Sequence, residues 1–305
     1  MIYRLKPGQP ISGGIKRIAA AQIKLVRAQL TGKASQGTAV HEARKAIKRL
    51  RALLTLIRPA IGKAAHAAMQ ERMRTIARSL SGLRDVQAML DTIARLEAYN
   101  PEVGGGPVAA ALRRHLEARG REAGEHLDRT APSAARKMAA EAKESFARLT
   151  LDDNFDPVAH GLEDNYRKAC RAFARAYDRD TGVAFHEWRK LVQRHWRHLQ
   201  LIAGAAPKRI RPLIRLARDL SATLGNDHDL EVLRDLVKAE GAGLGNRAEV
   251  KAYLALCRER QRGLRAEARR CGRRLFAKPA GVFAAQFREH WERAETRARQ
   301  DQSGD

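Results

Sequence analysis

Basic side chains recur one helical turn apart in two separated segments of the sequence. At about 100° of rotation per residue, the first segment places four of them on one helix face: His41, Arg44, Lys45 and Lys48. The second segment places an equivalent set, with one glutamine in it, on one face: His186, Arg189, Lys190, Gln193 and Arg197. Three further arginines flank the two rows: Arg49, Arg51 and Arg194. The opposite face of each segment is apolar, which predicts helices with one core face and one cationic face.

A cationic row of this kind suits a long, linear polyanion. Arginine and lysine one turn apart present positive charges at steps of about 5.4 Å, which allows repeated phosphate contacts. Like charges at these spacings repel one another, so a bound anion would offset a cost to the helix. The alternative is a solvated face without a ligand, although such faces usually mix both signs of charge. Four arginines extend the basic surface onto the next predicted helices: Arg74, Arg78, Arg211 and Arg218.

The histidines of the two rows admit two interpretations. His41 and His186 open the basic helices, where free backbone N–H groups favour an anion, and a histidine beside phosphate groups is protonated more readily. Metal ligation is the alternative, but no second histidine or acid recurs at ligand spacing in both halves, so no metal is expected. His195 falls on an apolar face, which predicts a hydrogen-bonded core residue.

The sequence lacks the common catalytic motifs. It contains no GxxxxGK[ST] loop, no GxSxG elbow and no HExxH helix. One segment, Asp227-His228-Asp229, suggests a metal-dependent hydrolase, but Arg84-Asp85-Val86 takes its place in the first half. We therefore predict that Asp85 and Asp227 are N-caps of the next helices. We also predict that the protein is not an enzyme and needs no cofactor.

The net charge points to an acidic partner. The 305 residues carry 59 Lys+Arg against 34 Asp+Glu, a formal net charge of +25. Nucleic acid, an anionic membrane surface and polyphosphate all qualify as partners on charge alone, and an arginine-rich, GC-rich genome could supply part of the excess without a function. No signal-peptide core opens the chain, no apolar stretch approaches about 18 residues, and the three cysteines form no CxxC pair, which together predict a cytoplasmic protein with no membrane span.

Composition and periodicity predict an all-α fold. Hydrophobic residues make up 44% of the chain and aromatic residues only 5%, and Ala, Leu, Arg and Glu dominate. Turn residues at 59–62, 100–107, 206–207 and 241–245 separate the helical segments. Helical periodicity predicts these segments: 10–30, 38–58, 63–82, 84–99, 107–127, 133–149, 157–178, 183–203, 208–224, 228–240, 246–275 and 280–298.

The second half of the sequence repeats the first. Pro10-Ile-Ser-Gly-Gly14 returns as Pro157-Val-Ala-His-Gly161, and Val40-His-Glu-Ala-Arg-Lys45 returns as Phe185-His-Glu-Trp-Arg-Lys190. The offset between the copies stays nearly constant along the chain. We therefore predict one domain over residues 1–305, built from repeated halves at 1–152 and 153–305.

These motifs resemble the CHAD family, the conserved histidine α-helical domain, over nearly the whole chain. The segments 40–54 and 186–199 are similar to the two histidine helices of that family, and 82–85 and 224–230 resemble the turns that follow. Gln193 stands where the family usually has lysine, and Arg197 where it often has tyrosine, which moves the charge of the second half by one turn. The resemblance implies ligand contacts from these motif positions: His41, Arg44, Lys45, Lys48, Arg49, Arg51, His186, Arg189, Lys190 and Arg194.

The resemblance also implies a fold and a function. It implies two tandem four-helix-type bundles related by a pseudo-twofold axis, with basic residues lining a groove or central pore. The implied ligand is inorganic polyphosphate, with association to polyphosphate granules or to polyphosphate-metabolising enzymes. Some relatives carry a triphosphate-tunnel hydrolase domain, but its ExExK motif is absent here. Weak, non-specific nucleic-acid binding is the alternative; it predicts exposed aromatic platforms, whereas Trp188 is expected in the core and only Trp196 near a basic face.

Overall fold

The computed structural model describes residues 3–29, 36–78, 83–125 and 131–303. It is 88% helical, and these ranges contain no strand, which confirms the all-α prediction. The helices follow one another in this order: α1 (Ile11–Gln29), α2 (Gln36–Leu56), α3 (Arg58–Arg78), α4 (Leu83–Tyr99), α5 (Pro101–Gly104), α6 (Pro107–Glu125), α7 (Ala131–Ala147), α8 (Asp156–Arg179), α9 (Gly182–Ile202), α10 (Pro207–Leu244), α11 (Arg247–Leu275) and α12 (Ala280–Ser303).

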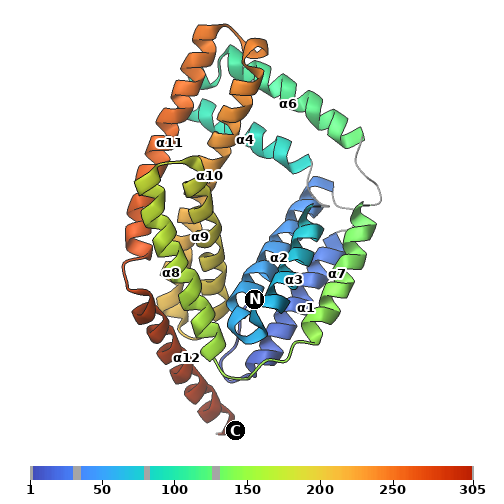
Figure 1. The fold of residues 1–305 in the computed structure, drawn as a ribbon, viewed down its shortest axis with the longest axis vertical. Helices are drawn as coiled ribbons and strands as arrows, with labels where there is room; N and C mark the ends of the chain where they lie inside the picture. Colours follow the sequence, from blue (N-terminus) through green and yellow to red (C-terminus); the bar gives the residue numbers. More distant parts are fainter. Residues whose placement is uncertain (1–2, 30–35, 79–82, 126–130, 304–305) are drawn as a thin grey trace.

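The long helices form two groups (Figure 1). In one group α2 packs against α1 and α3, and α7 packs against α1 and α3. In the other, α9 packs between α8 and α10, α11 lies on α10, and α12 lies on α8. These contacts place the two basic helices, α2 and α9, on the inner sides of their groups. They also contact each other, which brings together two segments that are far apart in the sequence.

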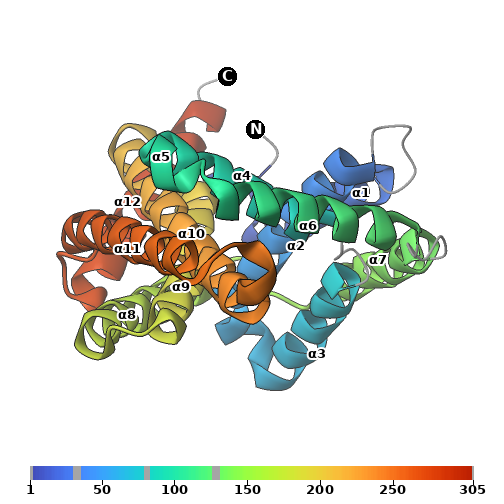
Figure 2. The same cartoon turned by 90° about the horizontal axis from the view of Figure 1, so that it is seen from above.

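The helices of the first half do not all pack within that half. Figure 2 shows α4 and α6 extending across one end of the molecule, from α10 and α11 towards α7. Their apolar side chains Ile93 and Leu112 belong to one buried cluster with Leu233 of α10 and Tyr253 of α11. Packing therefore crosses residue 152, so the repeated halves interpenetrate. The pseudo-twofold relation of two tandem bundles stays a prediction.

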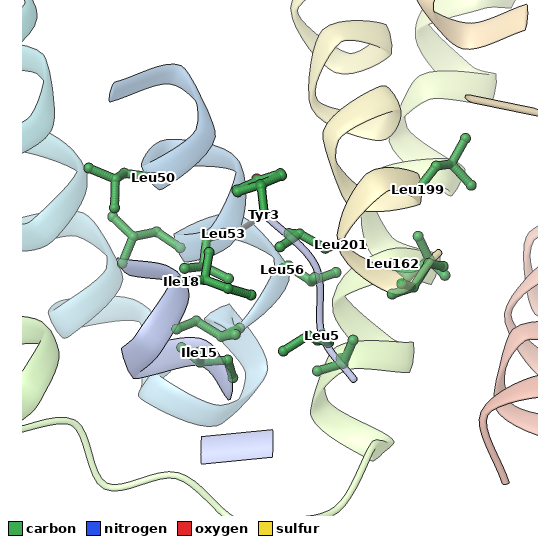
Figure 3. Close-up of a cluster of buried hydrophobic side chains, with 14 of the residues drawn as sticks. Tyr3, Leu5, Ile15, Ile18, Leu50, Leu53, Leu56, Leu162, Leu199 and Leu201 are labelled. Atoms are coloured by element: carbon green, nitrogen blue, oxygen red, sulfur yellow. The ribbon is translucent and has the colours of Figure 1, made fainter. Parts of the chain in front are cut away.

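A continuous apolar core joins α2 to α8 and α9 (Figure 3). It includes Leu53 and Leu56 of α2 and Leu162 of α8, all fully buried. At Gly161 a Cβ atom would lie 1.8 Å from the backbone oxygen of Leu56, so only glycine allows α8 to approach α2 this closely. This contact holds the two groups of helices at a fixed distance.

The prediction of a helix end and an Asp227 N-cap near residue 226 is wrong. α10 runs without a break through both predicted segments, and Asp227 lies inside it, only 2% exposed. The Asp227 carboxylate accepts a hydrogen bond from Arg265 Nε at 2.9 Å, so its role is a buried ion pair between α10 and α11. Gly225 keeps the helical path, and a Cβ atom at this position would make ordinary van der Waals contact with the Arg189 guanidinium of α9, at 3.8 Å. Asp85 falls in the first turn of α4, with a side chain outside the described residues.

Within the described ranges, none of the helices is both long enough and apolar enough to cross a membrane.

Candidate polyanion-binding site

The basic row of α2 is partly exposed, whereas the opposite face of the helix is buried in the core. Ala43, Ile47 and Leu50 are at most 1% exposed, and they hold α2 against the other helices. All six basic candidates on the helix lie outside this buried side: His41, Arg44, Lys45, Lys48, Arg49 and Arg51. Lys45 donates to Glu42 Oε1 at 2.7 Å, and its side chain remains 46% exposed. The predicted division into a core face and a cationic face is confirmed for α2.

The row of α9 has the same ion pair but sits deeper. Lys190 pairs with Glu187, and its side chain is also 46% exposed, which matches the Lys45 pair one repeat earlier. Trp188 is fully buried as predicted, whereas Arg197, predicted on the ligand-binding face, is only 8% exposed. Arg189, Gln193 and Arg194 are half-buried. The second row therefore offers fewer exposed charges than its sequence suggests.

His186 lies against a second histidine. Its ring and the ring of His228 on α10 have centroids 4.2 Å apart. Burial, together with the charges of His228, Lys190 and Arg189, lowers the pKa of His186 from 6.5 to about 4. His186 is thus neutral at pH 7 in the free protein, and a phosphate group beside the pair would favour its protonation. His228 was missed because the first half has Val86 at its repeat position, so the repeat carries no signal for it.

One pair of arginines joins the two rows next to Tyr3. The Arg49 guanidinium lies 5.8 Å from the centre of the Tyr3 ring, and the Tyr3 hydroxyl donates to the Arg49 backbone oxygen at 2.9 Å. Arg197 donates to the Gln193 backbone oxygen at 2.7 Å and stacks on Trp196 at 5.1 Å. Burial lowers the pKa of Arg197 to about 10, and the positive charge of Arg49 acts in the same direction. The two guanidinium groups therefore repel each other.

A second group of arginines forms on the other side of α2. Arg51 donates through Nε to Gln70 Oε1 at 3.1 Å, which fixes its guanidinium beside α3. Burial lowers the pKa of Arg51, and the positive charge of Arg74 lowers it further. Burial also lowers the pKa of Arg194, and the nearby charge of Arg51 adds to this effect. Three arginines from different helices, Arg51 of α2, Arg74 of α3 and Arg194 of α9, thus lie near one another.

The candidate arginines of α3 and α10 have different neighbours, and some of them are paired with acidic side chains. Arg74 and Arg78 share the carboxylate of Glu71. Arg218 pairs with Asp219 at 3.1 Å, which reduces its charge for a ligand. Arg211 lies away from α2, in a hollow between α10 and α12 that is lined by other basic residues, including Arg209, Arg293 and Arg297. Arg74 is close enough to the arginines of α2 and α9 that its charge lowers the pKa of both Arg51 and Arg194.

The arginines between α2 and α9 form no close ion pair within the described residues, although acidic side chains such as Glu71 act on Arg51 from farther away. In the described part of the chain, no carboxylate lies within ion-pair distance of four of them: Arg49, Arg51, Arg194 and Arg197. Asp164 and Glu187 attract Arg194 only from farther away. Burying positive charge without a counter-ion is costly, and guanidinium groups bind phosphate oxygens through paired hydrogen bonds. The arrangement therefore favours a ligand with several phosphate groups.

The other histidines of α9 belong to the core. His195 is fully buried, as predicted, and packs edge-on against Tyr166 with ring centroids 5.4 Å apart. Neither ring nitrogen of His195 has a hydrogen-bond partner among the described protein atoms, so the predicted hydrogen bond stays a prediction. His198 forms a hydrogen bond between its Nε2 and the Ala52 backbone oxygen at 2.9 Å, which links α9 to α2. Among the described residues, no three histidine, cysteine or acidic side chains form a group that could hold a metal.

Comparisons with known proteins agree with this geometry. A sequence profile described as the CHAD domain matches residues 17–238. The structure resembles the crystal structure of the CHAD domain from the plant Ricinus communis, with 19% identity, a TM-score of 0.62, and coverage of 89% of this chain and 94% of that one. It also resembles PptA from Streptomyces chartreusis, with 16% identity, a TM-score of 0.64, and coverage of 90% and 100%. No curated protein matches by sequence. Because the profile covers well over half of its length, the chain belongs to the CHAD domain family.

Proposed function

We propose that this protein binds long inorganic polyphosphate through the basic faces of α2 and α9. The carrying observation is the set of three half-buried arginines between these helices that have no carboxylate within ion-pair distance among the described residues: Arg49, Arg51 and Arg194. The CHAD family is associated with polyphosphate binding in general, which supports the choice of ligand. The ligand spans both faces, so a long chain gains a second, intramolecular contact.

Polyphosphate fits the site better than nucleic acid. Single-stranded nucleic acids are held by aromatic side chains that stack on the bases. Trp188 is fully buried, and Trp196 is half-buried with the Arg197 guanidinium stacked on it. Trp188 therefore offers no face to a base, and the Arg197 guanidinium occupies one face of Trp196. Phosphate contacts without base contacts suit a polymer that consists of phosphate alone.

The proposed role is binding without catalysis. The Asp227-His228-Asp229 segment supplies the acids that most resemble a hydrolase motif, but Asp227 pairs with Arg265 and Asp229 lies 3.7 Å from Arg95. Both carboxylates are thus used in ion pairs between helices. We further propose that the protein associates with polyphosphate granules or acts on polyphosphate-metabolising enzymes through the bound polymer.

A competition experiment tests this function. Fluorescently labelled duplex DNA is bound to the protein at physiological salt, and long-chain polyphosphate is added at equal phosphate concentration; the reverse order is run in parallel. We expect polyphosphate to displace DNA and DNA to displace polyphosphate poorly, because no base-reading surface lies beside the rows. DNA binding that survives excess polyphosphate would overturn the proposal. Phosphate release that requires a metal and is lost in Asp227→Asn would overturn the non-catalytic role.

A further inference from the structure

A second line of arginines lies on α11, away from the α2 and α9 rows. Its members are spaced three or four residues apart: Arg258, Arg262, Arg265, Arg269 and Arg273. At about 100° per residue they fall within about 80° of one another, on one face of the helix. At 1.5 Å per residue the line is about 22 Å long. We call these five residues the α11 arginine line.

The α11 arginine line borders a hollow of about 720 Å³ between α11, α10 and the end of α8. Four of its members are exposed: Arg258, Arg262, Arg269 and Arg273. In the described part of the chain, none of these four has a carboxylate within ion-pair distance. The two acids of the same stretch point to other partners, because Glu259 accepts from the Tyr99 hydroxyl at 2.8 Å and Glu267 accepts from Thr223 Oγ1 at 3.1 Å. The exposed charges are therefore not neutralised within the protein.

Two members of the line are held in place by contacts from beneath. Arg265 bonds to Asp227 and to Asp180, each at 2.9 Å, and stacks over Phe185 at 4.2 Å. The Arg269 guanidinium lies 5.0 Å from the centre of the Tyr177 ring. The Tyr177 hydroxyl in turn donates to the Arg265 backbone oxygen at 2.7 Å. Such contacts reduce the freedom that a guanidinium loses when it binds a ligand.

The α11 arginine line is separate from the α2 and α9 rows. In both Figure 1 and Figure 2, α11 lies at the outer edge of the molecule, with α10 and α9 between it and α2. All five residues also lie beyond residue 238, where the match to the CHAD profile ends. The two basic surfaces therefore do not form one continuous row.

We propose that the α11 arginine line is a second binding surface for inorganic polyphosphate, independent of the α2 and α9 rows. The choice of ligand rests on the proposed function, and the surface itself favours a bare phosphate polymer. Its two aromatic contacts offer no platform for bases, because Phe185 is buried beneath Arg265 and Tyr177 is half-buried with Arg269 over its ring. The hollow exposes Ala255 and Ala266 but no large apolar side chain that would enter a lipid layer.

Two separate surfaces allow one protein molecule to cross-link two polyphosphate chains, which a single site cannot do. Each molecule holds one polyphosphate chain at α2 and α9 and a second chain at α11. A long chain in turn binds several protein molecules, so the mixture forms a network rather than isolated complexes.

The test compares two variants that lose the same charge. Arg262→Gln/Arg269→Gln/Arg273→Gln removes three exposed members of the line, and Arg114→Gln/Arg119→Gln/Arg121→Gln removes three exposed arginines of α6 that do not share one face. Glutamine keeps the helix propensity, and circular dichroism checks the fold. With polyphosphate too short to reach both surfaces, calorimetry should count one bound chain fewer for the α11 variant than for wild type. With long chains, light scattering should show smaller assemblies for the α11 variant alone.

The outcomes separate this inference from the proposed function. If wild type binds no polyphosphate, the proposed function fails and the inference fails with it. If wild type binds and the α11 variant keeps both stoichiometry and assembly size, the α2 and α9 site stands and the second surface is rejected. If the α11 variant loses binding only to duplex DNA or to phosphatidylserine vesicles, the surface belongs to that partner and the inference is equally overturned.

Discussion

The basic helices α2 and α9 carry the same motif but bury it to different depths. Each helix has a glutamate–lysine ion pair near its start, Glu42–Lys45 in α2 and Glu187–Lys190 in α9, and the two lysines are equally exposed. Farther along, Ala52 of α2 occupies the repeat position of Arg197 in α9, and both residues are buried. An alanine is buried at little cost, whereas a buried arginine without a counter-ion is expensive. The comparison shows that a cation on the correct helical face is available to a ligand only where no neighbouring helix covers it.

The largest expected effect comes from neutralising one face at a time. We expect Arg44→Gln/Lys45→Gln/Lys48→Gln and Arg189→Gln/Lys190→Gln/Arg194→Gln each to weaken long-chain polyphosphate binding by about 100-fold, because the second, intramolecular contact is lost. The slope of log K against log salt should flatten by about 2 in each case. The α2 variant should lose more, because the α9 face is less exposed.

Binding isotherms at several salt concentrations measure both quantities, with the α6 triple variant as the equal-charge control. Wild-type affinity and slope in both face variants would show that the rows are solvated surface.

The next effect is a pH dependence of binding that we assign to His186 of α9. His186 has a pKa of about 4 in the free protein, so it is neutral at pH 7. A bound polyanion that restores its pKa towards 6.5 should raise the affinity by about tenfold between pH 7.5 and 5.5. His186→Asn should remove most of this rise, while His290→Asn on α12 should leave it unchanged.

The free protein should show the opposite trend. Because the folded pKa of His186 lies below the unfolded value of about 6.5, the unfolded chain takes up protons first and stability falls as the pH drops from 6.5 towards 4. Affinity and thermal unfolding measured over this range check both signs. An affinity that is independent of pH would place the phosphates away from His186.

A smaller effect tests the cost of the buried charge in α9. Arg197→Met should stabilise the unliganded protein by about 1 kcal/mol, because a buried guanidinium without an acidic partner is replaced by an apolar side chain of similar length. Arg49→Met, at a half-buried position, should change stability much less. Denaturant unfolding of the two variants makes the comparison, and a less stable Arg197→Met would show that Arg197 supports the fold instead.

The smallest effect comes from restoring a missing cation. Lys48 of α2 corresponds to Gln193 of α9, which is half-buried. Gln193→Lys should raise the affinity for long polyphosphate by about threefold and steepen the salt slope by about 0.7, as one added phosphate contact. Lys48→Gln should do the reverse by a similar amount. If Gln193→Lys leaves the slope unchanged, the ligand does not reach this turn of α9.

Most helices and both basic rows were predictable from the sequence, because helical periodicity and charge are local properties. The spacing of His41 to Lys48 and of His186 to Lys190 sufficed to place one cationic and one apolar face on each helix. The α11 arginine line is equally visible in the sequence, but it lies outside the repeat that directed attention to α2 and α9. The continuous α10 was mispredicted because Gly225 and Asn226 look like a helix end, although the helical backbone accommodates both.

By itself, then, the sequence determined the all-α class, the family and the faces that carry charge, since these follow from residue type and spacing. The tertiary structure alone decided which charges meet. Packing of α8 on α2 through Gly161 and the contact of α9 with α2 bring Arg194 near Arg51, and Arg197 is buried beside Arg49 and Tyr3. Packing of α9 on α10 sets His186 against His228. The physical reason is that burial and the field of neighbouring charges depend on residues from different helices, from about 40 to more than 140 positions apart in the sequence, whose proximity no local pattern encodes.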